Sequence, residues 1–119
     1  MEDDGTKKYQ IIIDGQVSHN SRGYSGFAKA IYPTEVEEIY EGEYLDGKRH
    51  GNGSYSYKNG DRYVGEWRHN EKHGIGRLTY ANEGEYFGRF ENGKRHGEGV
   101  FTYKKSNDIY SGFWQYGQK

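Results

Sequence analysis

The sequence contains no cysteine, a single proline and few aliphatic residues. The lack of cysteine excludes a disulfide framework, thiolate metal ligands and a cysteine nucleophile. Leu, Ile, Val and Phe together account for 18 of the 119 residues, which is too few for a large aliphatic core. Aromatic residues, at 17%, are too abundant for a disordered chain. We therefore expect aromatic side chains to supply the core.

The sequence also lacks an excess of charge of either sign and has no long apolar run. The chain has 17 Lys and Arg against 18 Asp and Glu, a formal net charge of −1, which argues against a nucleic-acid partner. The longest apolar run covers residues 11–13, whereas a transmembrane helix needs about 20 residues. The N-terminus is acidic, unlike the basic start of a signal peptide. These features predict a soluble, cytoplasmic chain.

A repeat of 23 to 24 residues organises most of the sequence. A Tyr-x-Gly-x-aromatic motif starts at Tyr40, Tyr63, Tyr86 and Tyr110. A His-Gly-x-Gly motif follows the first three, starting at His50, His73 and His96. Each of these three units then closes with an aromatic residue or Leu, one spacer and Tyr. Periods of this length are typical of proteins in which each unit packs on the next.

Residues within a unit alternate as they do along β-strands. In the first unit Tyr40, Gly42 and Tyr44 fall on one face, and Glu41 and Glu43 fall on the other. Polar stretches with glycine or asparagine separate the strands, which predicts tight turns. Rings packed on the glycines of a neighbouring unit would replace the missing aliphatic core. The expected fold is all-β: an elongated single-layer array of stacked antiparallel β-hairpins.

The chain divides into an N-terminal cap and a repeat array. The predicted boundaries are 1–39 for the cap and 40–119 for the array, with units 40–62, 63–85, 86–109 and a partial unit 110–119. In the cap, residues 24–39 form a degenerate half-repeat in which alanine replaces glycine and tyrosine, and residues 9–15 are its candidate first strand. Thr34 and Glu37 have capping-box spacing, which predicts one helical turn. The array stops where a fourth His-Gly-x-Gly is due, so we expect a fragment of a longer array.

These motifs resemble the MORN repeat family, whose unit reads roughly as Tyr-x-Gly-x-Trp, a Gly-Lys turn, His-Gly-x-Gly and an aromatic strand. The match covers residues 40–117 well and 9–39 poorly. The resemblance implies a curved or twisted rod of stacked hairpins that acts as a scaffold or docking surface without activity of its own. Family members include radial-spoke head proteins, cell-cortex scaffolds, junctophilins and the non-catalytic halves of some phosphatidylinositol-phosphate kinases and of a lysine methyltransferase. Residues 47–51 and 107–114 are most similar to the radial-spoke type, which implies a cytoskeletal location, with the ciliary axoneme first and the cell cortex second.

Nothing in the sequence indicates catalysis, a cofactor or a metal ion. His50, His73 and His96 recur at the repeat period, but a row of histidines does not converge as zinc ligands must. We interpret them as residues that hydrogen-bond the hairpin turns. No phosphate-binding loop with Gly-Lys-Ser/Thr is present. The carboxylates that alternate away from the rings predict a solvated face: Glu41, Glu43, Glu66 and Glu85. The chain is therefore predicted to be no enzyme and to hold no cofactor.

Two surfaces are candidates for binding. The first is a ladder of rings along a groove, where we expect partial exposure and a protein partner, such as a helix or a second copy. Its members are Tyr44, Trp67, Phe90 and Trp114. The second is a basic edge at the hairpin turns, suited to an acidic partner or anionic phospholipid. Its members are Lys48, Arg49, Arg68, Lys72, Lys94 and Arg95.

The favoured function is a non-catalytic scaffold that mediates protein–protein interaction in a cytoskeletal or ciliary assembly. One alternative is a membrane tether that binds phospholipid through the basic turns. Another is the regulatory repeat segment of a larger lipid kinase or methyltransferase. Acidic residues interspersed among the basic turns favour a role in solubility over direct lipid binding.

Overall fold

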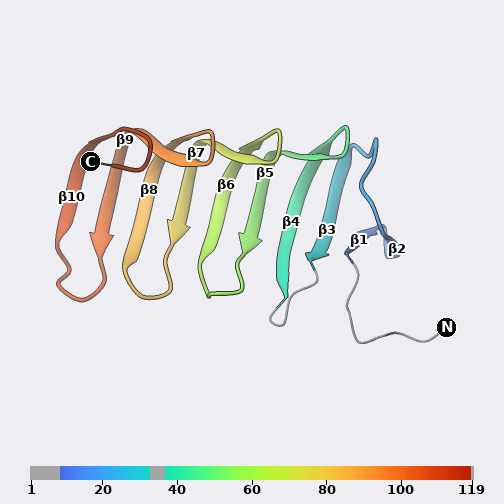
Figure 1. Cartoon of the computed structure of the whole chain (residues 1–119), viewed down its shortest axis with the longest axis horizontal. Coiled ribbons are helices and arrows are strands. Elements are labelled where there is room, and N and C mark those ends of the chain that lie inside the picture. The colour runs from blue at the N-terminus through green and yellow to red at the C-terminus, as the bar shows by residue number, and fades with distance from the viewer. Residues whose placement is uncertain (1–8, 33–36, 119) are drawn as a thin grey trace.

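The computed structural model describes residues 9–32 and 37–118, and these form one open β-sheet (Figure 1). Its strands are β1 (Gln10–Ile13), β2 (Gln16–Ser18), β3 (Gly26–Tyr32), β4 (Glu38–Leu45), β5 (Lys48–Ser56), β6 (Arg62–Arg68), β7 (Glu71–Thr79), β8 (Gly84–Glu91), β9 (Lys94–Tyr103) and β10 (Ile109–Trp114). Each strand is antiparallel to its neighbours. The described residues contain no helix, and so none that would cross a membrane. The predicted all-β, single-layer array of hairpins is confirmed.

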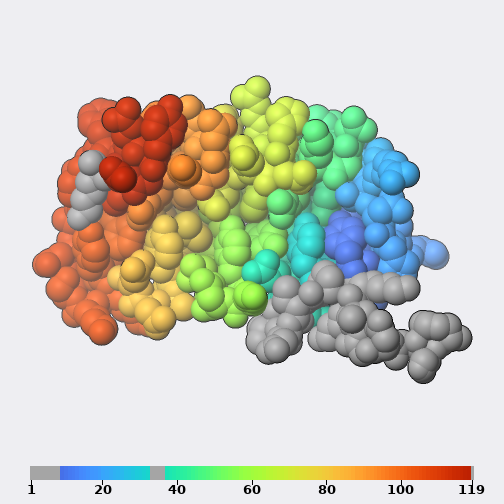
Figure 2. All heavy atoms as spheres, viewed as in Figure 1, coloured from blue at the N-terminus to red at the C-terminus, as the bar shows by residue number. Residues whose placement is uncertain are grey.

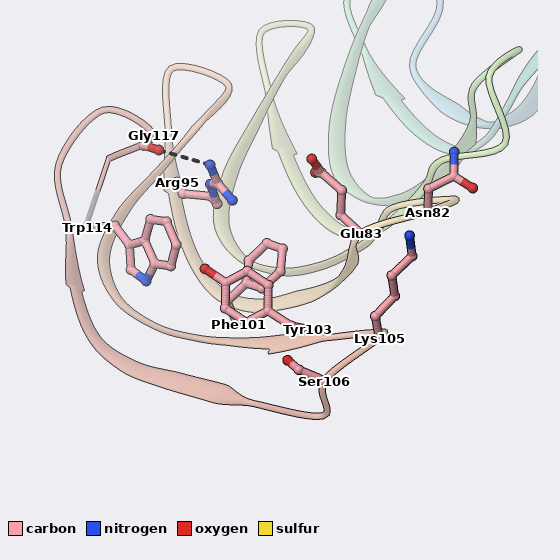
Figure 3. A pocket seen from close by; sticks show the side chains of 9 residues that line it. All are labelled: Asn82, Glu83, Arg95, Phe101, Tyr103, Lys105, Ser106, Trp114 and Gly117. Carbon is pink, nitrogen blue, oxygen red and sulfur yellow. Dashed lines mark hydrogen bonds between the residues drawn. The ribbon is translucent and has the colours of Figure 1, made fainter.

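The sheet is long and curved. Strand order follows the chain from β3 to β10, with β1 between β3 and β2. The principal extents are 53 × 29 × 21 Å, and Figure 2 shows successive parts of the chain as bands along one continuous body. The strands bend around the side chains of one face, as the view in Figure 3 shows. The sheet therefore has a concave and a convex face.

The core lies on the concave face and consists mainly of rings packed on glycine. Tyr63 is typical: it is fully buried, and its hydroxyl donates a hydrogen bond to the Glu66 carbonyl at 2.7 Å. Its ring covers Gly76 on the next strand, where an added Cβ would overlap the ring. Tyr40 covers Gly53 and Tyr86 covers Gly99 in the same way. Glycine is thus required at this position because a ring occupies the space of its side chain.

Rings also join each unit to the next. The Tyr63 ring makes edge-to-face contacts at 5.2 Å with both Trp67 of its own unit and Phe90 of the following unit. Tyr40 meets Trp67 at 5.3 Å, and Tyr86 meets Trp114 at 5.4 Å. These are favourable geometries for aromatic pairs. Three of these four contacts join successive units, so one unit alone could not make them.

Two-residue turns close the hairpins at one edge of the sheet. Asp46-Gly47 and Asn92-Gly93 have positive φ at both positions, as a hairpin turn of this type requires. The middle unit uses His69-Asn70 instead, also with positive φ. The Asn70 side chain accepts a hydrogen bond from the Arg49 backbone N–H at 2.9 Å. The asparagine in place of glycine therefore ties one turn to the preceding unit.

The N-terminal strands continue the array with smaller side chains. Ala28 pairs with Gly42 as Gly53 pairs with Gly65, and Ala30 is fully buried. Strand β1 falls within the predicted segment 9–15, whereas the three-residue strand β2 was not predicted. The predicted helical turn at Thr34 and Glu37 falls largely on residues 33–36, outside the described residues.

Candidate partner-binding groove

The four predicted ladder rings line the floor of the concave face. Their exposed fractions are 5%, 5%, 3% and 4% for Tyr44, Trp67, Phe90 and Trp114. Tyrosines of two adjacent units cover Trp67 and Phe90 from both sides, so the expectation that these rings remain partly exposed is wrong. They hold the units together and offer little surface to a partner.

A second line of rings forms the exposed aromatic surface of the groove. We call it the tyrosine row, and it consists of half-buried residues that close each unit: Tyr32, Tyr57, Tyr80 and Tyr103. Tyr57 lies against Tyr55 at 4.5 Å, and Tyr103 lies against Phe101 at 4.6 Å. The sequence signal was present, because the closing tyrosine recurs at the repeat period. The predicted ladder comprises only the rings next to the first glycine of each unit, so these tyrosines lie outside it.

The predicted basic edge divides into two sets that lie on different faces. Arg49, Lys72 and Arg95 are half-buried on the concave face, and we call them the groove cations. Lys48, Arg68 and Lys94 are exposed, and we call them the outer basic residues. The prediction of a single basic edge is therefore wrong. The turns are so short that both lysine–arginine pairs already lie in strands, where consecutive side chains point to opposite faces.

Each groove cation pairs across its hairpin with a ladder ring. The register places Arg49 opposite Tyr44, Lys72 opposite Trp67, and Arg95 opposite Phe90. The Arg95 guanidinium also lies 4.4 Å from the Trp114 ring centre in the next unit, and the Arg49 guanidinium lies 4.9 Å from that of Trp67. Lys72 Nζ lies 5.7 Å from the Tyr57 ring centre. Such cation–π contacts favour keeping the charge in place over the rings.

The two arginines are anchored to the turn of the following unit. Arg49 donates to the Asn70 carbonyl at 3.0 Å. Arg95 donates to the Gly117 carbonyl at 2.9 Å, as the dashed line in Figure 3 shows. Lys72 donates at 3.3 Å to the Tyr57 hydroxyl, so it bonds a side chain of the tyrosine row and not a backbone turn. The arginines therefore have fixed positions in the groove.

Three hollows follow one another along the groove. The first, of about 400 Å³, is lined by Tyr32 and Arg49, and the second, of about 260 Å³, by Arg49, Lys72 and Glu71. The third, of about 650 Å³, is lined on one side by Arg95 and Trp114 and on the other by Glu83 and Lys105 (Figure 3). Each hollow has one more cationic than anionic side chain in its lining.

Burial changes the ionisation of the groove. Desolvation raises the pKa of Tyr57 and of Tyr86 to about 12, and it raises the pKa of Tyr63 further. Burial also lowers the pKa of Lys72, and the nearby Arg49 charge lowers this pKa in addition. The tyrosines are therefore neutral near pH 7 and add no negative charge beside the groove cations.

The periodic histidines lie at the edge of the sheet near the turns. His96 Nδ1 accepts a hydrogen bond from the Tyr116 backbone N–H at 3.3 Å, and its ring lies 4.7 Å from that of Tyr116. The rings of His50 and His69 lie 5.8 Å apart. Within residues 9–32 and 37–118, no three His, Asp or Glu side chains come together in a way that would hold a metal ion.

The curved single-layer sheet and its ring-lined groove define a β-hairpin repeat protein whose units stack through one face. The model of the MORN repeat matches residues 40–62, 63–85 and 86–107, which is more than half of the chain. The chain belongs to the MORN repeat family. A comparison with curated proteins gives no match. MORN repeats are modules for interaction with proteins or lipids and are generally not catalytic.

Proposed function

We propose that this chain is a non-catalytic scaffold that binds a protein partner in its concave groove. The observation that carries the proposal is the tyrosine row, a line of half-buried rings that runs beside the groove cations across successive units. Tyrosine supplies a large apolar surface together with a hydroxyl, and it is enriched at protein interfaces. A groove of this composition suits an elongated protein segment better than a compact small molecule.

The resemblance to radial-spoke and cell-cortex scaffolds motivates the cellular setting. We therefore place the partner in a cytoskeletal assembly, with the ciliary axoneme first and the cell cortex second. Immunofluorescence of the tagged full-length protein tests this setting, and a diffuse signal without cytoskeletal association would contradict it.

Co-purification with paired ring variants tests the groove. Tyr57→Ala with Tyr103→Ala removes two rings from the tyrosine row, and Phe87→Ala with Phe113→Ala removes two exposed rings from elsewhere on the sheet. The assay uses a purified partner protein that binds the purified parent chain. We expect the first pair of substitutions to abolish this binding and the second pair to leave it intact. Equal loss with both pairs would contradict a groove-specific role. Far-UV circular dichroism establishes that the variants remain folded.

A membrane tether is the second candidate, and the exposure of the outer basic residues favours it. Each such charge contributes on the order of 1 kcal/mol at an anionic membrane. Flotation with vesicles of phosphatidylcholine and phosphatidylserine tests it, with Lys48→Glu, Arg68→Glu and Lys94→Glu combined. Retention of vesicle binding by this triple variant would exclude the outer basic residues as the lipid contact.

A further inference from the structure

The groove cations lack carboxylate partners in the described chain. The ion pair that forms within residues 9–32 and 37–118 joins Arg77 to Glu85 at 3.1 Å, and both residues lie outside the groove. The carboxylates near the groove cations are Glu38, whose side chain accepts a hydrogen bond from the Tyr55 hydroxyl, Asp61, Glu71 and Glu83, and none of the four makes an ion pair with a groove cation. A half-buried cation that has no carboxylate within ion-pair distance interacts favourably with an incoming carboxylate.

The groove cations are also evenly spaced. They occupy equivalent positions in three consecutive hairpins, so each lies two strands from the next. Neighbouring strands are about 4.8 Å apart, which places the cations roughly 10 Å apart along the groove. A ligand that engages all three needs negative charges at the same interval and on one side.

A straight α-helix meets this requirement. Seven residues of α-helix rise about 10.5 Å and return to nearly the same face. In a β-strand, residues three apart cover roughly the same distance but point to opposite faces. Apolar residues between the carboxylates would lie on the tyrosine row. The helix is therefore the regular structure that presents both chemistries to this groove.

The shape of the groove disfavours a membrane as the ligand of these three cations. The strands curve around Arg95 and the rings beside it (Figure 3). A flat bilayer meets the rim of a concave surface before its floor, so it reaches the outer basic residues first. A narrow polypeptide segment enters the groove without that restriction.

We propose that the groove binds an acidic amphipathic helix whose Asp or Glu residues recur every seven positions and pair with Arg49, Lys72 and Arg95. This inference rests on the proposed function, because it specifies the partner of the same groove. The helix runs along the sheet, with its carboxylates on the groove cations and its apolar side chains on the tyrosine row.

Synthetic peptides provide the probe. One is a helical peptide with three Glu residues at seven-residue spacing, and its isomer has the same composition with the Glu residues distributed around the helix. We expect the spaced peptide to bind the full chain at least about tenfold more tightly in a fluorescence-anisotropy titration, because exposed ion pairs are individually weak but three act together. Equal affinity for the two peptides would overturn the proposal.

Matched variants of the protein locate the contact. Arg49→Gln, Lys72→Gln and Arg95→Gln combined remove three charges from the groove, and Lys48→Gln, Arg68→Gln and Lys94→Gln combined remove three from the outside. We expect roughly a tenfold loss of peptide affinity for the first set and less than about a threefold loss for the second. Similar losses for both sets would show non-specific attraction and overturn the proposal.

A charge swap keeps the test decisive if the triple groove variant does not fold. Lys72 does not anchor a turn through its side chain, so Lys72→Glu is the variant of choice. It should weaken the spaced peptide, and a peptide with Lys at the middle position should restore binding. Failure of that rescue in a folded variant counts against the proposed pairing.

Two further outcomes separate this inference from the proposed function. If the tyrosine-row variants lose the protein partner while the triple groove variant keeps it, the groove is a protein site and the acidic-helix inference is wrong. The parent chain could instead bind phosphatidylserine vesicles but not the spaced peptide, with vesicle binding lost in the triple groove variant. In that case the groove is a lipid site, and both the proposed function and the acidic-helix inference are wrong.

Discussion

The two faces of the sheet follow different rules. On the concave face the same kind of residue returns in every complete unit, as with Tyr40, Tyr63 and Tyr86. On the convex face the next position along the strand changes from Glu41 to Val64 and then to Phe87, all of them exposed. The concave face is constrained because each ring touches its own unit and the next. The convex side chains are exposed and are not enclosed between the rings of two units, so their identity is freer to vary.

The convex position occupied by Glu43 and Glu66 is an exception, because these side chains bond the backbone. Glu43 accepts a hydrogen bond from the Asn52 backbone N–H at 3.1 Å, and Glu66 accepts one from Ile75 N–H at 3.2 Å. Both carboxylates lie beside the first glycine of His-Gly-x-Gly, which has positive φ. The predicted solvated face therefore includes two glutamates that bind the backbone at the irregular point of the hairpin.

Alkaline pH should have the largest effect on stability, and this effect should come from the concave face, where the tyrosines with a raised pKa lie. Burial raises the pKa of eight concave-face tyrosines: Tyr32, Tyr40, Tyr44, Tyr55, Tyr57, Tyr63, Tyr80 and Tyr86. An unfolded tyrosine ionises near pH 10, so these groups stabilise the fold fully below about pH 10 and lose that contribution as pH rises towards their folded values. We expect cooperative unfolding between about pH 10 and 12, when tyrosinate absorbance and near-UV circular dichroism change together. Ionisation of more than five of the 13 tyrosines before unfolding would contradict the burial of these eight rings.

Removal of a ladder ring should have the next largest effect. Trp67 contacts Tyr40, Tyr55 and Tyr63, and its indole N–H donates to the Gly53 carbonyl at 3.1 Å. We expect Trp67→Ala to lower the free energy of unfolding in urea by about 3–5 kcal/mol.

Trp114 is the matched control for this ring. It occupies the same repeat position on the edge strand β10, but its indole nitrogen has no hydrogen-bond partner among the described residues. Trp114→Ala should therefore cost less than Trp67→Ala. Trp114 has equivalent ring contacts, to Tyr86, Phe101 and Tyr110, so an equal or larger cost would show that the indole hydrogen bond and the interior position of Trp67 add little to stability.

Filling a covered glycine should have an intermediate effect. Gly76→Ala inserts a methyl group into the space held by the Tyr63 ring. We expect a loss of about 2–3 kcal/mol, as for other overpacked sites. Gly93→Ala is the control, because its Cβ would meet nothing and only its positive φ would be strained. Urea unfolding should rank Gly76→Ala as the more harmful change, and the reverse ranking would contradict ring-on-glycine packing.

The sequence predicted the strands well because the packing is periodic. Tyr-x-Gly-x-aromatic and His-Gly-x-Gly each place alternate residues on the core, and the turn residues fit two-residue connections. The groove was predicted less well, since alternation shows which face Trp67 occupies but not that neighbouring tyrosines cover it. The separation of Arg49 from Lys48 followed from the turn length, because a two-residue turn at Asp46 and Gly47 already sets Arg49 opposite Tyr44.

The smallest effect is expected on the convex face. Phe87 is 46% exposed, and its main partner is the Arg77 guanidinium at 5.2 Å from the ring centre. Exposed cation–π contacts contribute about 0.5–1 kcal/mol, so Phe87→Ala should lower the free energy of unfolding by no more than that. Binding of the spaced acidic peptide should be unchanged, because Phe87 points away from the groove cations. A loss of stability as large as that of Trp67→Ala, or a loss of peptide binding, would show that the convex face is packed or used in the protein and that the contrast between the faces is false.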